Sequence, residues 1–253
     1  MDDLELAASL VRAAGTLAAQ MRAGGQMDLD AEHKTSISDI VTAADHAAEA
    51  LVVERLRALR PDDSIVGEEG AEHVGTSGRT WVIDPVDGTW NFFHGLDWWC
   101  SAIALTGPDD VILGAIHHPA GDATYAGGPG LPATRNGVPI PPLVDRPTES
   151  VGATTYLHPT SLGGEVASAF FRAAAQVATL RFLGSGSMDA TAVAQGTIGV
   201  SFQHSVPDWD RLPGEAILRS LGGERVCVEA GGVTWNVMGL PTPVRDVAAA
   251  LPG

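Results

Sequence analysis

The sequence predicts an α/β fold, with antiparallel strands in the first half of the chain and a mixed or parallel sheet in the second. Two patterns support this. Between residues 100 and 126, short apolar runs alternate with Gly, Pro and Asp turns, which is typical of antiparallel strands. From residue 163 onward, helix-like and strand-like segments alternate, which favours a parallel or mixed sheet. We expect a single domain over residues 1–253, with halves of about 1–145 and 146–253.

Two helices are expected near the N-terminus. Residues 3–23 place apolar side chains along one face at helical spacing. A second helix is expected over residues 42–59, where Thr42 is a suitable N-cap. Asp45 follows three residues later, where a carboxylate completes a capping box. Capping is one interpretation of Asp45, and a place in a functional site is the other.

The remaining elements follow from apolar runs bounded by turn residues. In the first half, strands are expected over residues 64–66, 81–83, 100–106, 111–117 and 123–126. Residues 127–142 are rich in Gly and Pro and are expected to form a loop. In the second half, helices are expected over residues 163–177, 187–195 and 210–221, and strands over 179–183, 198–203 and 224–228.

Composition excludes several classes of partner. The formal net charge is −16, and a chain this acidic repels nucleic acid and anionic membrane surfaces. No apolar run is long enough to span a membrane, and the acidic N-terminal residues do not fit a secretory signal. The two cysteines, Cys100 and Cys227, are expected to be reduced thiols. These features together predict a cytoplasmic protein.

The most informative segment is residues 84–92, which read Asp-Pro-Val-Asp-Gly-Thr-Trp-Asn-Phe. Asp84 and Asp87 follow the predicted strand 81–83, and Gly88 and Thr89 are typical of a turn into a helix. Carboxylates bind hard metal ions through oxygen, and the free N–H groups at a helix start bind anions. The segment therefore predicts a site for cations and a phosphate together.

Acidic residues in other segments can join this site. Glu68 and Glu69 follow the strand 64–66, and Asp210 lies far downstream. Carboxylates that converge repel one another strongly unless cations neutralise them, so divalent metal is the natural solution. Lys34, the single lysine in the chain, lies upstream of Asp45.

These motifs resemble those of the inositol monophosphatase family. They are the Glu-Glu pair at 68–69, the signature at 84–92 and Trp-Asp-x-x-x-Gly at 209–214, in the family's order. The resemblance runs from the region of Lys34 to Gly223. It implies a Mg²⁺-dependent, lithium-sensitive phosphatase and an αβαβα sandwich with the site between its halves. We also expect a homodimer.

The resemblance implies a role for each matching residue. Glu68, Asp84 and the backbone carbonyl of Val86 would bind the first of two or three Mg²⁺ ions. Asp84, Asp87 and Asp210 would bind the second, and Glu68 would contact a third.

The resemblance also assigns the residues around the substrate. Thr89, with Asp45, would orient the attacking water, and the amides of Gly88 and Thr89 would bind the phosphate. The substrate would face Gly184, Ser185, Gly186, Gln203 and Asp210. Lys34 and Glu69 would lie just outside the metal ligands.

Two residues depart from the family's pattern. Gln203 stands where the inositol-cleaving members have a glutamate that contacts substrate hydroxyls. Glutamine can still form a hydrogen bond with a hydroxyl, but it carries no charge. Pro213 stands where the family usually has alanine, at a position expected in the first turn of a helix, where proline is tolerated.

The expected activity is Mg²⁺-dependent hydrolysis of a small sugar or polyol phosphate monoester, with inositol 1-phosphate first. Activated water can do this chemistry without a nucleophilic side chain. Histidinol phosphate is the next candidate substrate, followed by nucleoside 3′,5′-bisphosphates and fructose 1,6-bisphosphate. A non-catalytic regulator that binds metal or phosphate is an alternative of another class, and it predicts the loss of a metal ligand.

Overall fold

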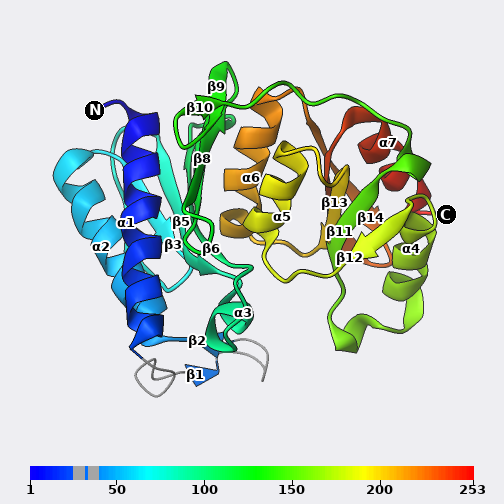
Figure 1. Cartoon of the computed structure of the whole chain (residues 1–253), viewed down its shortest axis with the longest axis horizontal. Helices are drawn as coiled ribbons and strands as arrows, with labels where there is room; N and C mark the ends of the chain where they lie inside the picture. The colour runs from blue at the N-terminus through cyan, green and yellow to red at the C-terminus, as the bar shows by residue number, and fades with distance from the viewer. Residues whose placement is uncertain (25–31, 34–39) are drawn as a thin grey trace.

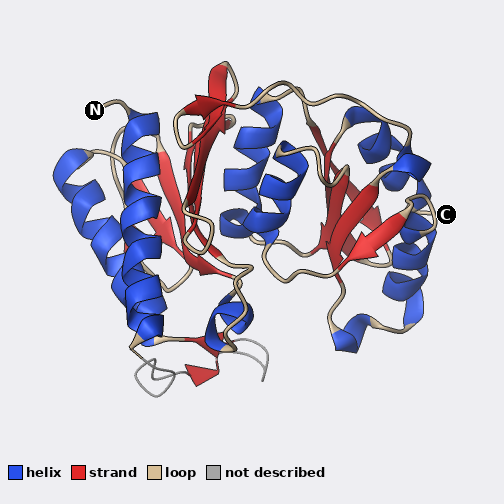
Figure 2. Ribbon diagram, viewed as in Figure 1, coloured by secondary structure: helices blue, strands red, loops and turns tan. Residues whose placement is uncertain are grey.

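The computed structural model describes residues 1–24, 32–33 and 40–253 of the chain. Helices and sheets alternate in five layers (Figures 1 and 2). An eight-stranded sheet and a five-stranded sheet enclose a central pair of helices, and a further pair covers each outer face. The outer pairs are α1 (Asp3–Ala23) with α2 (Ala43–Leu59) and α4 (Gly164–Ala174) with α7 (Pro241–Ala250), and the central pair is α5 (Gly186–Ala194) with α6 (Asp208–Ser220). The predicted αβαβα sandwich is confirmed.

The larger sheet is mainly antiparallel, as predicted for the first half. Its order is β10-β9-β8-β7-β6-β5-β3-β4, and its one parallel pair among the described residues is β3 with β5. The strands are β3 (Ser64–Gly67), β4 (Glu72–His73), β5 (Thr80–Asp87), β6 (Cys100–Thr106), β7 (Val111–His118), β8 (Ala123–Gly128), β9 (Leu131–Arg135) and β10 (Val138–Pro139). Two short strands, β1 (Glu32–His33) and β2 (Ile40–Val41), pair separately.

The smaller sheet is mixed, with the order β12-β11-β13-β15-β14. Strand β11 is parallel to both of its neighbours, while β15 is antiparallel to β13 and β14. The strands are β11 (Gly152–Tyr156), β12 (Thr179–Arg181), β13 (Val200–His204), β14 (Glu224–Ala230) and β15 (Val233–Gly239). The short helices are α3 (Thr89–Phe93), η2 (Thr148–Ser150) and η3 (Pro159–Ser161).

Separate apolar clusters lie between the layers. Leu10 of α1 and Leu56 of α2 pack against Trp81 and Ile103 on the outer face of the larger sheet. Side chains of α5 and α6 fill the space between the larger sheet and the region of β15. A third cluster lies between the smaller sheet and helices α4 and α7. Because α5 and α6 contact elements of both sheets, they connect the two halves of the chain.

The structure corrects the expected loop over residues 127–142, because strands β9 and β10 form a hairpin there. Its two-residue turn is Asn136-Gly137, and both residues have positive φ, +52° and +77°. An Asn-Gly turn between short strands is a strong hairpin signal. Gly130 and Gly137 form tight turns between short strands instead of belonging to one long loop. Strands β11 and β15 and helix α7 were also not anticipated.

The position of Pro213 is a second correction. Helix α6 begins at Asp208, two residues earlier than expected, so Pro213 lies inside the helix and beyond its first turn. Proline has no N–H to donate to the preceding turn, which weakens the helix there. The helix packs closely at this point, since a Cβ added at Gly114 of β7 would lie 2.3 Å from the Pro213 carbonyl oxygen.

Within the described part of the chain, none of the helices has the length and apolar character that crossing a membrane requires.

Candidate active site

The two signature carboxylates lie on one face of β5 because the strand contains a bulge. Asp84 is opposite Ala102 of β6, and Asp87 is opposite Cys100. Three steps along β5 therefore match two steps along β6, which leaves one extra residue. In a regular strand, residues three apart point to opposite faces. The bulge at Pro85-Val86 removes this alternation. The strand thus extends past its predicted end at Ile83 and carries both carboxylates.

Asp210, in the first turn of α6, completes a cluster with these two residues. One carboxylate oxygen from each of Asp84, Asp87 and Asp210 lies within 4.8 Å of the others. Both carboxylate oxygens of Asp84 are buried and have no hydrogen-bond partner. A buried carboxylate left without a partner is costly, whereas a bound cation would neutralise it. Oxygen ligands in this number suit Mg²⁺, so the residues present fit the expected metal.

The crowding of carboxylates changes their acidity. Burial, followed by the charges of Glu68, Asp87 and Asp210, raises the pKa of Asp84 well above its usual range. Burial also raises the pKa of Asp210, with Asp87 and Glu68 adding to the effect. Burial raises the pKa of Asp87 too, although hydrogen bonds from residues 185–187 oppose the shift. In the absence of bound cations, the cluster therefore retains protons that isolated carboxyl groups would have lost.

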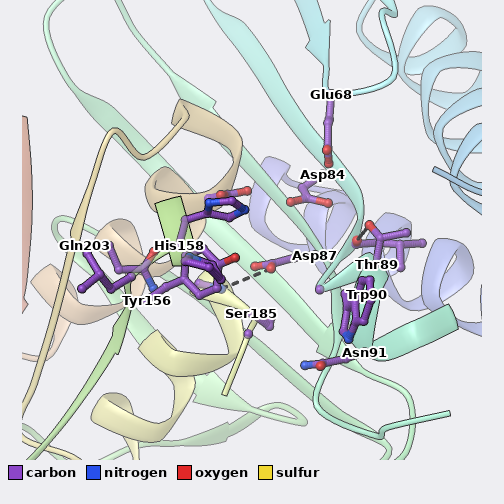
Figure 3. Close-up of a pocket in the computed structure, with 17 residues that line it drawn as sticks. Glu68, Asp84, Asp87, Thr89, Trp90, Asn91, Tyr156, His158, Ser185 and Gln203 are labelled. Carbon is purple, nitrogen blue, oxygen red and sulfur yellow. Dashed lines mark hydrogen bonds between the residues drawn. The ribbon is translucent and has the colours of Figure 1, made fainter. Parts of the chain in front are cut away.

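A cavity of about 650 Å³ opens beside this cluster (Figure 3). Glu68, which follows β3, and Asp84 point toward one another at one end of it. Most of the predicted site residues line the cavity: Glu68, Asp84, Val86, Asp87, Gly88, Thr89, Gly184, Ser185, Gly186, Gln203 and Asp210. The structure thus brings together segments that are up to 142 positions apart in the sequence, from Glu68 to Asp210.

Gly88 forms the turn between β5 and α3. Its φ of +92° lies in the left-handed region, which glycine adopts at little cost. A Cβ at this position would also lie only 3.0 Å from the carbonyl oxygen of Gly184. The signature turn and the loop before α5 can therefore pack closely only with glycine at position 88. This contact keeps the first turn of α3 next to the segment expected to face the substrate.

Asp45 caps α2 and also contacts Thr89 of the signature segment. Its Oδ2 accepts hydrogen bonds from the backbone N–H and the hydroxyl of Thr42, at 2.9 and 2.5 Å, which closes the capping box of α2. Its Oδ1 lies 3.3 Å from Thr89 Oγ1, which is also 3.0 Å from the carbonyl oxygen of Val86. Burial raises the pKa of Asp45 to about 7. The Thr89 hydroxyl has one proton, so it can donate to only one of these two acceptors at a time.

Of the predicted residues that the structure describes, Asp45 and Glu69 do not line the cavity. Asp45 contacts Thr89, as just described. Glu69 follows Glu68, and its backbone N–H donates to the carboxylate of Glu49 at 2.9 Å. Lys34 lies outside the described residues.

Sequence reasoning missed one wall of the cavity. Tyr156 is the last residue of β11, an unexpected strand, and Leu157, His158 and Pro159 follow it, while Trp90 and Asn91 belong to α3. Trp90 and Tyr156 are 43% and 44% exposed, and in Figure 3 they lie on opposite sides of Asp87. The available signals were Trp90, an aromatic residue within the signature, and Tyr156, an aromatic residue three positions before Pro159. None of the described lining residues is Lys or Arg.

Comparisons of the sequence and the fold with known proteins find members of one family. A sequence model of the inositol monophosphatase family matches residues 2–250. The fructose-1,6-bisphosphatase/inositol-1-monophosphatase of Thermotoga maritima is 32% identical over 224 residues, which cover 88% of this chain and 84% of that protein. The inositol-1-monophosphatase of Rhizobium meliloti is 31% identical over 226 residues, covering 85% and 82%. The solved structure of the Thermotoga maritima IMPase superimposes with a TM-score of 0.83 at 28% identity, covering 99% and 98%.

Proposed function

The chain belongs to the inositol monophosphatase family and is a phosphomonoesterase of that family, and we propose that it uses Mg²⁺ to hydrolyse small sugar or polyol phosphate monoesters, with inositol 1-phosphate first. The convergence of Asp84, Asp87 and Asp210 on one cavity carries this proposal, because it supplies the oxygen ligands that the chemistry needs.

The residues expected from sequence to bind Mg²⁺ are proposed as its ligands. Asp84, Asp87, Asp210, Glu68 and the Val86 carbonyl would hold two or three Mg²⁺ ions. When bound, these ions would acidify a water molecule and neutralise charge on the phosphate and the leaving oxygen. The carboxylates would fix the positions of the ions, and burial would strengthen their electrostatic interactions because the surrounding medium has low polarity.

The signature turn and α3 would handle the phosphate and the attacking water. The backbone N–H groups of Gly88 and Thr89, at the start of α3, would donate to phosphate oxygens. Thr89 Oγ1 would orient the water, and Asp45 would accept from that hydroxyl at the 3.3 Å contact. Lys34 and Glu69 are proposed to act from outside this group, as the family resemblance implies.

The charges along the cavity support a substrate with a single phosphate. One phosphate can bind at the proposed metal ions and the Gly88 amide. Lys or Arg would favour a second phosphate, and none of the described lining residues is either. Gln203, Tyr156 and His158 instead present polar and aromatic groups on the far wall, which suits an uncharged polyol or the ring of histidinol phosphate. We therefore propose the monoesters ahead of both bisphosphates.

An assay of the purified protein with a panel of phosphate esters tests this function. The panel contains inositol 1-phosphate, histidinol phosphate, fructose 1,6-bisphosphate, adenosine 3′,5′-bisphosphate and glycerol 2-phosphate. We expect hydrolysis of the monoesters with Mg²⁺, loss of activity with a chelator and recovery when Mg²⁺ is restored. Full activity in chelator would refute the metal mechanism. Phosphate or metal binding with no turnover of any ester would favour the non-catalytic regulator.

We further propose a homodimer that forms through the edge of the smaller sheet. Strand β12 is at this edge, and edge strands offer unpaired backbone groups to a partner. Phe171 and Phe182 are 61% and 54% exposed, and the ring of Phe170 contacts both, at 5.4 and 6.0 Å between centroids. Light scattering after gel filtration should show a dimer that Phe182→Glu converts to monomer. A wild-type monomer would contradict the proposal.

The proposed location is the cytoplasm, and the whole chain is proposed to act as one domain. Cys100 is buried and Cys227 is exposed, and both are free thiols, which suits a reducing compartment. The contacts of α5 and α6 with elements of both sheets support the single domain.

A further inference from the structure

Glu49 contacts the turn that carries Glu68. It belongs to α2, four residues after Asp45, and is only 5% exposed. Its two carboxylate oxygens each accept a backbone N–H from the turn. Oε2 accepts from Glu69 at 2.9 Å, and Oε1 accepts from Ala71 at 3.0 Å. Buried carboxylates are rare unless paired, and this one is satisfied by the backbone of a single turn.

The turn is shaped to receive this carboxylate. A Cβ at Gly67 would lie 2.1 Å from Glu49 Oε2, so any larger residue would push the carboxylate away. The turn is closed by hydrogen bonds from the Gly67 N–H to the Ala71 carbonyl at 2.8 Å and from the Gly70 N–H to the Gly67 carbonyl at 3.2 Å. The Glu68 N–H donates to the carbonyl of Ile83, the residue before Asp84, at 3.1 Å. Glu68 therefore sits on a backbone fixed on two sides.

We propose that Glu49 is a positioning residue that holds Glu68 in place for metal binding. This proposal rests on the proposed function in one respect, the assignment of Glu68 as a ligand. Helix α2 then positions two parts of the site, the signature segment with Thr89 and the turn that carries Glu68. Asp45, at the start of the helix, contacts Thr89, and Glu49, one turn later, holds the turn of Glu68. Residues four apart lie on the same face of a helix, so a single rigid element fixes both.

The substitution Glu49→Gln tests the proposal with little change in shape. Glutamine has one acceptor oxygen, and its NH₂ group would face one of the two N–H groups donor to donor. We expect Mg²⁺ binding, measured by calorimetry without substrate, to weaken by about 10–100-fold, as for other groups that support a metal ligand. At saturating Mg²⁺, kcat should return to near the wild-type value, and KM for the ester should not change. Glu54→Gln, an exposed glutamate on the same helix, is the matched control and should change nothing.

A second pair of variants tests the contact itself. Gly67→Ala should weaken Mg²⁺ binding in the wild-type background, because the new Cβ displaces the Glu49 carboxylate. In a Glu49→Ala background, the same change should have a much smaller effect, because the displaced group is gone. Circular dichroism and the unfolding temperature in chelator establish that each variant is folded. If Glu49→Gln alone does not fold, this pair of variants tests whether the Glu49 carboxylate positions Glu68.

Two outcomes would overturn the proposal. One is unchanged Mg²⁺ affinity in folded Glu49→Gln, even with a lower unfolding temperature. The other is an equal effect of Gly67→Ala in both backgrounds. The proposed function fails differently, through a wild-type protein that hydrolyses no ester. The calorimetric comparison of Glu49→Gln with Glu54→Gln needs no turnover, so it remains decisive in that case.

Discussion

The carboxylate of Asp87, at the end of β5, accepts the backbone N–H of Ser187 at 2.5 Å, across 100 positions of sequence. Its other oxygen accepts the N–H of Gly186 at 3.1 Å. Both N–H groups belong to the first turn of α5, where helix N–H groups have no partner within the helix. Asp87 thus caps α5 from the other half of the chain and contributes an oxygen to the carboxylate cluster. The Gly186 N–H, expected to face the substrate, is already occupied by this bond.

Asp87→Asn should greatly reduce turnover without unfolding the protein. The charge that the proposed metal ions require is removed, so kcat should fall by at least about 10²-fold, as when a preorganised electrostatic group is lost. One charge-assisted hydrogen bond to α5 is also lost. In chelator this loss is offset, because the variant has less carboxylate repulsion and no buried charge at position 87. Assays at saturating Mg²⁺ and unfolding curves in chelator measure the two effects separately.

Asp109→Asn, at an exposed aspartate, is the control for the loss of one negative charge. It should leave kcat unchanged. An Asp87→Asn enzyme with wild-type kcat would show that the metal ions bind elsewhere.

The local features of the fold were predictable from sequence because they depend on neighbours along the chain. Helix α1 occupies the expected residues 3–23, and β6 the expected residues 100–106. The capping box of Thr42 and Asp45 is present as the spacing indicated. These assignments rest on periodicity and on capping, which act within a few residues.

The other features of the fold and the site depend on contacts between segments far apart in the sequence, which no local pattern encodes. The bulge that brings Asp84 and Asp87 to one face is defined only by the partner strand β6. Tyr156 reaches the cavity because β11 pairs in parallel with β13, where Tyr156 is opposite Gln203. The bond from Ser187 to Asp87 likewise requires the two halves to be packed together. Sequence therefore indicated the acidic residues that converge in the candidate site and Gln203, and missed Tyr156 and His158 on the far wall.

The stability of the metal-free protein should fall as pH rises from about 6.5 to about 8. Burial raises the pKa of Asp45 to about 7 and shifts those of Asp84 and Asp210 upward. The folded state therefore binds more protons than the unfolded state, and its advantage is lost as these groups ionise. His117 acts in the opposite sense. Burial lowers its pKa to about 4 from 6.5, so it makes stability rise with pH between these two values. That rise is nearly complete at the start of this window.

Unfolding temperatures in chelator across this window measure the effect. Mg²⁺ should make the slope shallower, because bound cations offset the ionised carboxylates. Asp45→Asn should also make it shallower, since the group that titrates near pH 7 is gone. An unfolding temperature that rises with pH in chelator would show that these carboxyl groups ionise freely in the folded protein.

Lithium should inhibit the enzyme in the millimolar range. The family resemblance implies that Li⁺ replaces the second Mg²⁺, whose proposed ligands are Asp84, Asp87 and Asp210. All three are carboxylates and suit a small hard cation. Inhibition should not be relieved by excess substrate, and K⁺ at equal ionic strength should have no comparable effect. Full activity in Li⁺ well above the Mg²⁺ concentration would contradict this ligand assignment.

Gln203→Glu should change the choice of substrate while leaving the metal requirement intact. Gln203 lines the cavity on the wall opposite Glu68 and is not part of the carboxylate cluster. A hydrogen bond to a charged group differs from a neutral one by roughly 1 kcal/mol, so kcat/KM for inositol 1-phosphate should shift several-fold relative to glycerol 2-phosphate. The Mg²⁺ concentration for half-maximal activity should not change. Equal shifts for both esters, or none for either, would mean that Gln203 does not contact the polyol, and the specificity wall would then have to be sought at Tyr156 and His158.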